Sequence, residues 1–139
     1  MTSAENRAAN VRLLALDVDG VMTDGLIYYS NSGEELKAFN IKDGLGIKLL
    51  QTAGVKVAII TGRQSEIVAR RAQELGIDCV MQGREDKREA LMELCQSNDI
   101  ELVACAYMGD DLPDLGAIRA AGLGMTVADG SSAVREAAD

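Results

Sequence analysis

The 139-residue sequence predicts an α/β fold built on a parallel sheet, with a β-hairpin inserted after the first strand. Short apolar runs alternate along the chain with longer amphipathic stretches, which is typical of strands that alternate with helices. The length is close to that of one ordinary domain. No linker, repeat or low-complexity tract divides the sequence, so we expect residues 1–139 to form a single domain.

The first strand and the hairpin are predicted from the pattern of residues 11–40. The apolar run 11–16 forms a buried strand that ends at Asp17. Residues 25–40 differ, because two apolar and aromatic segments flank the turn-forming residues 31–33 (Asn-Ser-Gly). Such a pattern indicates two antiparallel strands joined by a turn.

The rest of the chain alternates helices and strands. Gly54 and Gly76 each follow an amphipathic stretch and are suited to end a helix. We predict helices over 43–53, 65–75, 87–97, 114–121 and 131–138, and strands over 56–60, 78–81, 102–108 and 124–127.

The composition excludes several classes of function. The chain contains no histidine, so it has no Ser-His-Asp triad, no imidazole base and no histidine-ligated zinc. Its net charge is −8 and only 3% of its residues are aromatic, which disfavours binding to nucleic acid. Carboxylate, hydroxyl, lysine, arginine and hard-metal chemistry remain.

Targeting signals and cysteines indicate a cytoplasmic protein. Residues 1–10 lack the basic and apolar regions of a signal peptide. The sequence contains no apolar stretch near the ~18 residues that span a bilayer, so we expect no membrane association. Cys79, Cys95 and Cys105 are widely spaced among apolar neighbours, and we expect them to be buried, reduced thiols.

Polar side chains cluster where the predicted strands end. Asp17 and Asp19 follow the first strand, residues 61–63 (Thr-Gly-Arg) and 109–111 (Gly-Asp-Asp) follow two others, and Lys87 begins a helix. The carboxyl ends of parallel strands are where α/β sheets bind ligands. Carboxylates that converge repel one another unless a cation intervenes, so a Mg²⁺ site is expected here.

These residue types together favour phosphoryl transfer. A carboxylate can attack phosphorus, a second can handle the proton, and a hydroxyl and an ammonium can hold the phosphoryl oxygens. Each element alone has a simpler interpretation. Asp17-x-Asp19 could be an exposed turn, Asp110 and Asp111 could cap a helix, and Lys87 could be solvated. All of them at strand ends, in this order, favour a phosphoryl site.

Residues 16–25 (Leu-Asp-Val-Asp-Gly-Val-Met-Thr-Asp-Gly) resemble the first motif of the haloacid dehalogenase-like phosphatases, and Thr61, Lys87 and residues 109–114 resemble the other three. Residues 33–44, together with Ile60-Thr61-Gly62-Arg63, are similar to a capless subgroup that acts on eight-carbon sugar-acid phosphates. The resemblance implies a Rossmann-like sheet with helices on both faces, no cap domain, and a homotetramer joined through the hairpins.

The resemblance also implies roles for individual residues. Asp17 would be the nucleophile and Asp19 the general acid and base, while Thr61 and Lys87 would bind the phosphoryl group. Mg²⁺ would be held by the Asp17 carboxylate, the Asp19 backbone carbonyl and Asp110, with Asp111 and Asp114 in support. The implied substrate contacts are Asp19, Asn40, Ile41, Lys42, Asp43, Gly44, Lys48, Arg63, Arg71 and Lys87.

The implied reaction is hydrolysis of 3-deoxy-D-manno-octulosonate 8-phosphate, a step in the synthesis of lipopolysaccharide precursors. The resemblance further implies that Arg63 and Glu74 favour this eight-carbon substrate, because related nine-carbon phosphatases tend to carry an acidic residue and a lysine at these two positions. Either Arg63 or Arg71 could instead form a surface ion pair with Glu66 or Glu74, worth at most ~1 kcal/mol. Members of the subgroup continue past the Arg135 region with a Gly-Gly-x-Gly tail. The chain ends at Asp139, so we expect it to be naturally short or truncated.

Other functions stay open at this point. Within enzymes, the alternative is a phosphatase for a nine-carbon ulosonate 9-phosphate or another small phosphate ester. A receiver-like signalling module also uses a phospho-accepting aspartate, a threonine and a lysine, but it carries the aspartate later in the chain. A non-catalytic scaffold is the third alternative. For the apolar hairpin, the alternative to assembly is that it folds back on its own core.

Overall fold

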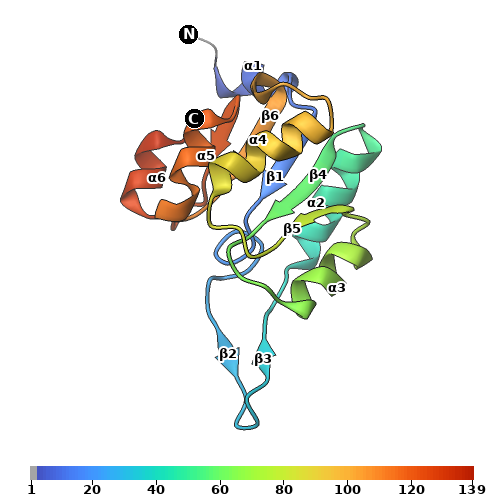
Figure 1. The fold of residues 1–139 in the computed structure, drawn as a ribbon, viewed down its shortest axis with the longest axis vertical. Coiled ribbons are helices and arrows are strands. Elements are labelled where there is room, and N and C mark those ends of the chain that lie inside the picture. The colour runs from blue at the N-terminus through green and yellow to red at the C-terminus, as the bar shows by residue number, and fades with distance from the viewer. Residues whose placement is uncertain (1–2) are drawn as a thin grey trace.

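Five parallel strands form the central sheet of the computed structural model, which describes residues 3–139 (Figure 1). These strands are β1 (Leu13–Leu16), β4 (Lys56–Ile60), β5 (Cys79–Met81), β6 (Cys105–Met108) and β7 (Leu123–Met125). Their order across the sheet is β5-β4-β1-β6-β7. Counted along the chain, this is strand order 3-2-1-4-5, the Rossmann-like arrangement, and the order reverses between β1 and β6.

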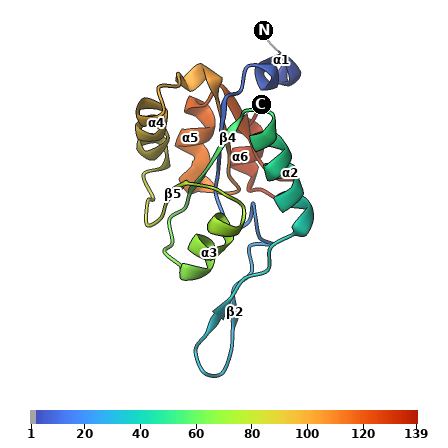
Figure 2. The same cartoon turned by 90° about the vertical axis from the view of Figure 1, so that its right-hand side faces the viewer.

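Helices cover both faces of the sheet, as Figure 2 shows for α2 and α4 on opposite sides. The α-helices are α1 (Ala4–Ala9), α2 (Ile41–Thr52), α3 (Glu66–Glu74), α4 (Lys87–Ser97), α5 (Leu115–Ala120) and α6 (Ser132–Ala137). Two short 3₁₀ helices, η1 (Leu102–Ala104) and η2 (Leu112–Asp114), flank β6. The predicted α/β class, with a Rossmann-like sheet and helices on both faces, is confirmed.

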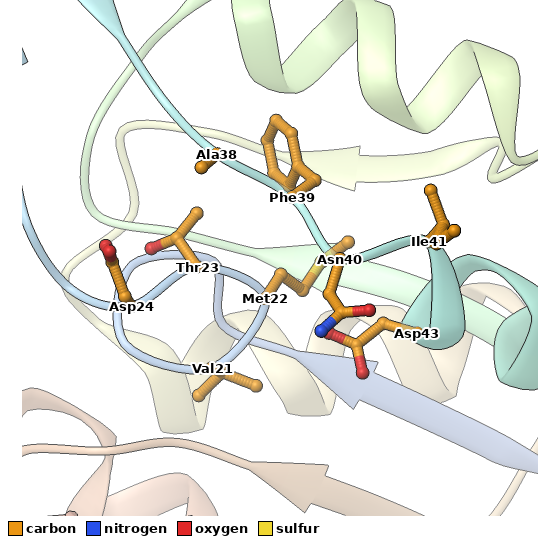
Figure 3. Close-up of a pocket in the computed structure, with 9 residues that line it drawn as sticks. All are labelled: Val21, Met22, Thr23, Asp24, Ala38, Phe39, Asn40, Ile41 and Asp43. Atoms are coloured by element: carbon orange, nitrogen blue, oxygen red, sulfur yellow. The ribbon is translucent and has the colours of Figure 1, made fainter.

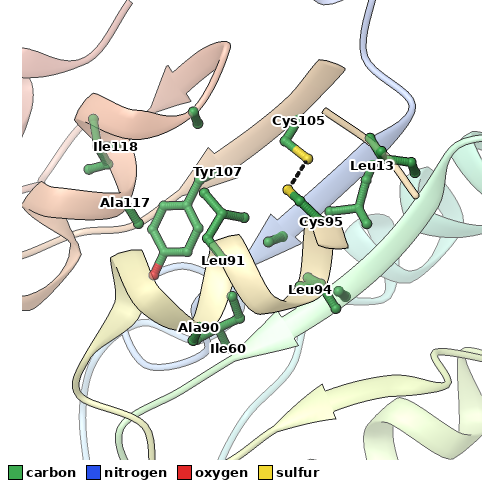
Figure 4. Close-up of a cluster of buried hydrophobic side chains, with 14 of the residues drawn as sticks. Leu13, Ile60, Ala90, Leu91, Leu94, Cys95, Cys105, Tyr107, Ala117 and Ile118 are labelled. Carbon is green, nitrogen blue, oxygen red and sulfur yellow. Dashed lines mark hydrogen bonds between the residues drawn. The ribbon is translucent and has the colours of Figure 1, made fainter. Parts of the chain in front are cut away.

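The two hydrophobic cores follow from the alternation of side chains along the strands. Leu13 and Ala15 of β1 face the cluster that contains residues of α4, α5 and α6 (Figure 4). Leu16, on the opposite face, joins the cluster that contains residues of α2 and α3. Because successive side chains of a strand point to opposite faces, a strand covered on both sides must be apolar throughout.

The predicted hairpin is present and projects away from the sheet (Figures 1 and 2). Its strands are β2 (Tyr28–Tyr29) and β3 (Glu35–Leu36), with Tyr28 paired to Leu36 and Tyr29 to Glu35. Within residues 3–139 this hairpin is the insertion between β1 and α2.

The structure differs from the predicted elements in several places. Helix α2 starts at Ile41, because the Asn40 side chain caps it by accepting a hydrogen bond from the Lys42 N–H at 2.8 Å. The predicted strand 102–108 begins with η1, and only its second half is a strand. Helix α1 was not predicted; none of its residues is buried, so no apolar periodicity marks it.

The three cysteines are free thiols, but the prediction that all of them are buried is wrong for Cys79. Cys95 and Cys105 are buried, with their Sγ atoms 2.8 Å apart (Figure 4), and Cys79 is half-buried. None of the helices in residues 3–139 has the length and apolar character that crossing a membrane requires. Met1 and Thr2, which belong to the segment tested for a signal peptide, lie outside the described residues.

Candidate active site

Asp17 stands at the carboxyl end of β1, beside the point where the strand order reverses. Its N–H donates to the Met108 carbonyl at 3.0 Å, which ties it to the end of β6. Its Oδ1 accepts a hydrogen bond from the Val18 N–H at 2.8 Å, and the residue is only 8% exposed. The second carboxylate oxygen is therefore the one available for a ligand.

Lys87, the first residue of α4, places a buried ammonium group against this carboxylate. Its Nζ lies 3.2 Å from Asp17 Oδ1 and 2.9 Å from Asp114 Oδ1, and the side chain is 3% exposed. It also donates to the Tyr107 hydroxyl at 3.3 Å. A buried charge is stable only when it is paired and hydrogen-bonded, so the two carboxylates and Lys87 require one another.

Both carboxylate oxygens of Asp114, next to Asp17 and Lys87, accept hydrogen bonds. Its Oδ1 accepts from Lys87 and from the Tyr107 hydroxyl. Its Oδ2 accepts from the backbone N–H groups of Asp110 and Asp111, at 3.0 and 3.2 Å. Burial opposes its ionisation, but Lys87 and these hydrogen bonds outweigh it and lower the pKa of Asp114. Asp114 therefore fixes the loop that carries Asp110.

Asp110 approaches the loop after β1 more closely than most side chains permit. A Cβ at Gly20 would lie 1.8 Å from Asp110 Oδ2, and Gly20 has a φ of +88°. Only glycine meets both conditions without displacement, since it tolerates positive φ and has no Cβ. Burial and the nearby Asp114 carboxylate raise the pKa of Asp110.

Asp17, Asp110 and Asp114 form a carboxylate cluster that suits a divalent cation. Each offers an oxygen within 4.8 Å of the others. Burial raises the pKa of Asp17 to about 7, with a further contribution from Asp114, although Lys87 acts in the opposite direction. The raised pKa values of Asp17 and Asp110 indicate that negative charge is unfavourable on these two carboxylates, and a hard cation would offset that charge.

Thr61 directly follows β4, the neighbour of β1, and is 2% exposed. Its N–H donates to the Met81 carbonyl at 2.9 Å, and its carbonyl accepts from the Arg84 N–H at 3.0 Å. These bonds fix its backbone at the same edge of the sheet as Asp17, as predicted from the strand pattern.

Asp19 lies outside the carboxylate cluster just described. Its Oδ1 is 2.6 Å from Nζ of Lys37, a residue of the returning arm of the hairpin. The loop after β1 thus presents two aspartates to two different lysines.

Several predicted substrate contacts line a pocket of about 550 Å³ beside the loop after β1 (Figure 3). Asn40, Ile41 and Asp43 form one side of it, with Phe39 above them, and residues 21–24 form the other. Figure 3 shows the Asn40 and Asp43 side chains next to each other at one end. The side chains of the carboxylate cluster do not line this pocket.

Arg71 is wedged beside the first turn of α2. A Cβ at Gly44 would lie 2.8 Å from Arg71 Nη2, so the glycine makes room for the guanidinium group. The guanidinium carbon lies 5.6 Å from the centre of the Phe39 ring, and a longer contact of 3.7 Å joins Nη1 to Glu74. Its buried Nε has no hydrogen-bond partner among residues 3–139.

The other basic residues that were predicted to contact substrate do not form one cluster. Arg63 is 40% exposed and pairs with Glu35 of β3, with Nη2 2.9 Å from Oε1. Its partner is therefore on the hairpin, and the alternative interpretation, an ion pair of Arg63 with Glu66 or Glu74, does not describe the structure. Lys42 and Lys48 are exposed. Lys48 lies seven residues beyond Ile41, about 10 Å along α2, and is the least central of the set.

Sequence reasoning missed three residues that contact the predicted site. Tyr107 looked like an ordinary core residue because it lies in an apolar strand. Glu35 and Lys37 belong to the hairpin motif, residues 33–44, but no role was predicted for either of them from the sequence. The available signal was the alternation of Glu35, Leu36 and Lys37, which puts both charges on one side of β3 and its extension.

A known family model, described as haloacid dehalogenase-like hydrolase, matches residues 79–139. The chain is 52% identical over 123 residues to the 3-deoxy-D-manno-octulosonate 8-phosphate phosphatase of Yersinia pestis, covering 88% of this chain and 66% of that protein. The Salmonella typhi protein of the same name is 48% identical over 128 residues, covering 92% and 68%. The chain thus spans about two thirds of the length of the curated relatives it matches.

A solved structure agrees with this result. The crystal structure of the Moraxella catarrhalis phosphatase of that name, in complex with magnesium, phosphate and a KDO molecule, superposes with a TM-score of 0.96 at 48% identity. The match covers 98% of this chain and 78% of that one. The chain belongs to the 3-deoxy-D-manno-octulosonate 8-phosphate phosphatase family of haloacid dehalogenase-like hydrolases.

Proposed function

We propose that this chain is a Mg²⁺-dependent phosphatase that hydrolyses 3-deoxy-D-manno-octulosonate 8-phosphate to the sugar acid and phosphate. The observation that carries the proposal is the buried contact of Asp17 with Lys87, beside the Asp110 and Asp114 carboxylates at the edge where the strand order reverses. The names of the family members supply the substrate. We further propose that residues 1–139 form one cytoplasmic domain that acts in lipopolysaccharide precursor synthesis.

The donor set fits Mg²⁺, which prefers oxygen ligands from one or two carboxylates. Asp17 and Asp110 would hold the ion together with the Asp19 backbone carbonyl. Asp114 and Asp111 would support it from below, because both oxygens of Asp114 are occupied and the Asp111 N–H is one of their donors. When bound, the ion offsets the charges of the nucleophile and of the phosphoryl oxygens.

In the first step, the free oxygen of Asp17 attacks phosphorus and the bond from phosphorus to the ester oxygen breaks, which leaves an aspartyl-phosphate. Asp19 gives its proton to the departing sugar hydroxyl. In the second step, Asp19 takes a proton from a water molecule that attacks the same phosphorus, and the bond to Asp17 breaks. Phosphate leaves, and both aspartates return to their starting state.

Lys87 and Thr61 would hold the phosphoryl group during both steps. The Lys87 ammonium lies 3.2 Å from Oδ1 of the Asp17 carboxylate, so it is close enough to contact an oxygen of a phosphoryl group bound to the other oxygen of that carboxylate. The Thr61 hydroxyl would donate from the end of the neighbouring strand. Both side chains are buried and fixed before substrate arrives, which avoids the cost of ordering them during the reaction.

The sheet order disfavours a receiver-like signalling module. Such modules have strand order 2-1-3-4-5, whereas this sheet has order 3-2-1-4-5, counted along the chain. A direct test is phosphate release from p-nitrophenyl phosphate in the presence of Mg²⁺. A phosphatase releases many equivalents of phosphate per chain, whereas a phospho-accepting module stops after about one.

Arg63 is proposed to recognise the substrate carboxylate. We expect Arg63→Ala to lower kcat/KM for the octulosonate phosphate at least about tenfold, since charge-assisted hydrogen bonds of this kind are worth ~1.5–3 kcal/mol. The same variant should barely change hydrolysis of p-nitrophenyl phosphate, which has no carboxylate. Steady-state kinetics on both substrates provides the test, and equal losses on the two would show that Arg63 serves the phosphoryl group or the fold.

A homotetramer joined through the hairpins is the proposed assembly. The hairpin exposes large apolar side chains in residues 3–139: Leu26 (59%), Ile27 (46%), Tyr28 (42%), Tyr29 (65%) and Leu36 (52%). A two-stranded hairpin is marginal in water and needs a packing partner, and these side chains do not pack on their own core.

Light scattering at micromolar concentration should therefore give about four times the chain mass of 14.7 kDa. The Tyr29→Asp variant should shift this mass toward the monomer, because a buried charge opposes association. As a control, Val103→Asp changes an apolar residue that is 68% exposed but lies far from the hairpin, before β6, and should leave the mass unchanged. A monomeric wild-type chain would refute the assembly.

A further inference from the structure

Lys37 carries a buried charge that the phosphoryl-transfer mechanism does not use. Its side chain is only 1% exposed, although it belongs to the returning arm of a solvent-exposed hairpin. Its Nζ lies 2.6 Å from Asp19 Oδ1 and 3.2 Å from Glu35 Oε1. Burying an ammonium group is costly unless carboxylates compensate it, so Lys37 is held in one place by these two partners.

The contact constrains Asp19 more than any other contact in residues 3–139. The Asp19 side chain is 26% exposed, and in that part of the chain its carboxylate has Lys37 as its only cation or side-chain donor. The loop that carries Asp19 does not place the carboxylate among those of Asp17, Asp110 and Asp114. Without Lys37, the Asp19 side chain would be free to change rotamer toward solvent.

Glu35 extends this contact to the candidate substrate site. Its Oε1 lies 3.2 Å from Lys37 Nζ and 2.9 Å from Arg63 Nη2, both at ion-pair distance without the alignment of a hydrogen bond. Asp19, Lys37, Glu35 and Arg63 therefore alternate in charge along one continuous series of contacts. The series begins after β1, crosses the hairpin and ends after β4.

We propose that Lys37 is a positioning residue for Asp19: it holds one carboxylate oxygen so that the other is aimed at the leaving oxygen of the substrate. The proposal rests on the proposed function, since it gives Asp19 the role of general acid. Effective proton transfer requires the acid within hydrogen-bond reach of the leaving oxygen, so a group that fixes the acid acts on the rate. In this arrangement the hairpin contributes directly to the chemistry.

The test compares Lys37→Met, which keeps the length of the side chain but removes its charge, with Lys37→Arg, which keeps the charge. We expect Lys37→Met to lower kcat for the octulosonate phosphate at least about tenfold with little change in KM, and Lys37→Arg to restore much of it. Lys56→Met is the matched control, because the Lys56 ammonium binds Asn98 at the opposite end of the sheet. Thermal unfolding of each variant verifies that it is folded.

The choice of substrate separates positioning from a structural role. A sugar alcohol is a poor leaving group and needs the acid, whereas p-nitrophenolate leaves without much help, so the loss in kcat/KM should be smaller for p-nitrophenyl phosphate. In an Asp19→Asn background, Lys37→Met should change kcat/KM by less than about twofold, because the group it positions is gone.

The outcomes distinguish this proposal from the proposed function. Equal losses on both substrates, or a full additional loss in the Asp19→Asn background, would overturn the positioning role and leave the phosphatase assignment intact. If Lys37→Met had the same kcat and KM as the wild type, the positioning role would likewise be overturned and the phosphatase assignment would stand. A wild-type chain that hydrolyses no phosphate ester would refute the proposed function, and this proposal with it.

Discussion

The Asp17→Asn variant is expected to fold and to hydrolyse phosphate esters at least about ten-thousandfold more slowly than the wild type. The carboxylate at the end of β1 is the only group that the proposed mechanism uses as a nucleophile, and a neutral amide cannot attack phosphorus. The side chain remains similar in size, and its Oδ1 can still accept from the Val18 N–H. Initial rates of phosphate release measure the loss.

The same variant should differ from the wild type in the pH dependence of its stability. Without divalent cations, burial raises the pKa of Asp17 from 3.8 to about 7. Between these values the unfolded chain loses the proton and the folded chain keeps it, so the wild-type free energy of unfolding falls as pH rises from about 4 to about 7. Asp17→Asn removes this titration, so its free energy of unfolding should change less between about pH 4 and pH 7 than that of the wild type.

Asp78→Asn is a control for both the reaction rate and the pH dependence of stability. It changes an exposed aspartate directly before β5, at the amino ends of the strands, whereas the site is at their carboxyl ends. It should match the wild type in rate and in pH dependence. If the Asp17→Asn variant kept a tenth or more of the wild-type rate, the assignment of Asp17 as the nucleophile would be wrong, because the amide cannot replace the carboxylate in that role.

Removal of Mg²⁺ is expected to have the second large effect, lowering the rate at least about a thousandfold and reversibly. Asp17 and Asp110 lie together with Asp114, and without a cation the attacking carboxylate faces both its neighbours and the charged phosphoryl group. Chelation followed by readdition of Mg²⁺ measures the effect. Ca²⁺ should restore the rate poorly, because it takes more ligands at longer and less regular distances.

Binding of Mg²⁺ should also raise the thermal unfolding temperature of the wild type, because a ligand that binds only the folded state stabilises it. Asp110→Asn should lose most of this rise as well as the activity, whereas Asp78→Asn should keep both. A rate unaffected by thorough chelation would contradict the metal site, and a stability increase that survives in Asp110→Asn would place the ion elsewhere.

The arrangement of the sheet and the main cluster could be predicted from the sequence because both depend on local pattern. Apolar runs marked the strands, and the residues that end them, such as Asp17, Thr61 and Asp110, lie at one edge in any parallel sheet. The structure brings Lys87 to this edge, since its helix starts directly after the loop from β5.

The contacts between distant segments could not be predicted in the same way. Lys37 meets Asp19 and Arg63 meets Glu35 only because the hairpin returns across the loop after β1. The sequence indicates only that Tyr107 is a core residue, and the structure shows that its hydroxyl donates to Asp114. In each case the sequence shows a charge or a hydroxyl, but its partner depends on tertiary packing.

The most direct test of the proposed function is a comparison of kcat/KM across sugar-acid phosphates for the wild-type chain with Mg²⁺. We predict that 3-deoxy-D-manno-octulosonate 8-phosphate exceeds a nine-carbon ulosonate 9-phosphate and simple sugar phosphates at least about tenfold, the difference that one or two charge-assisted contacts provide. Equal rates across the panel, or preference for the nine-carbon ester, would contradict the proposed substrate.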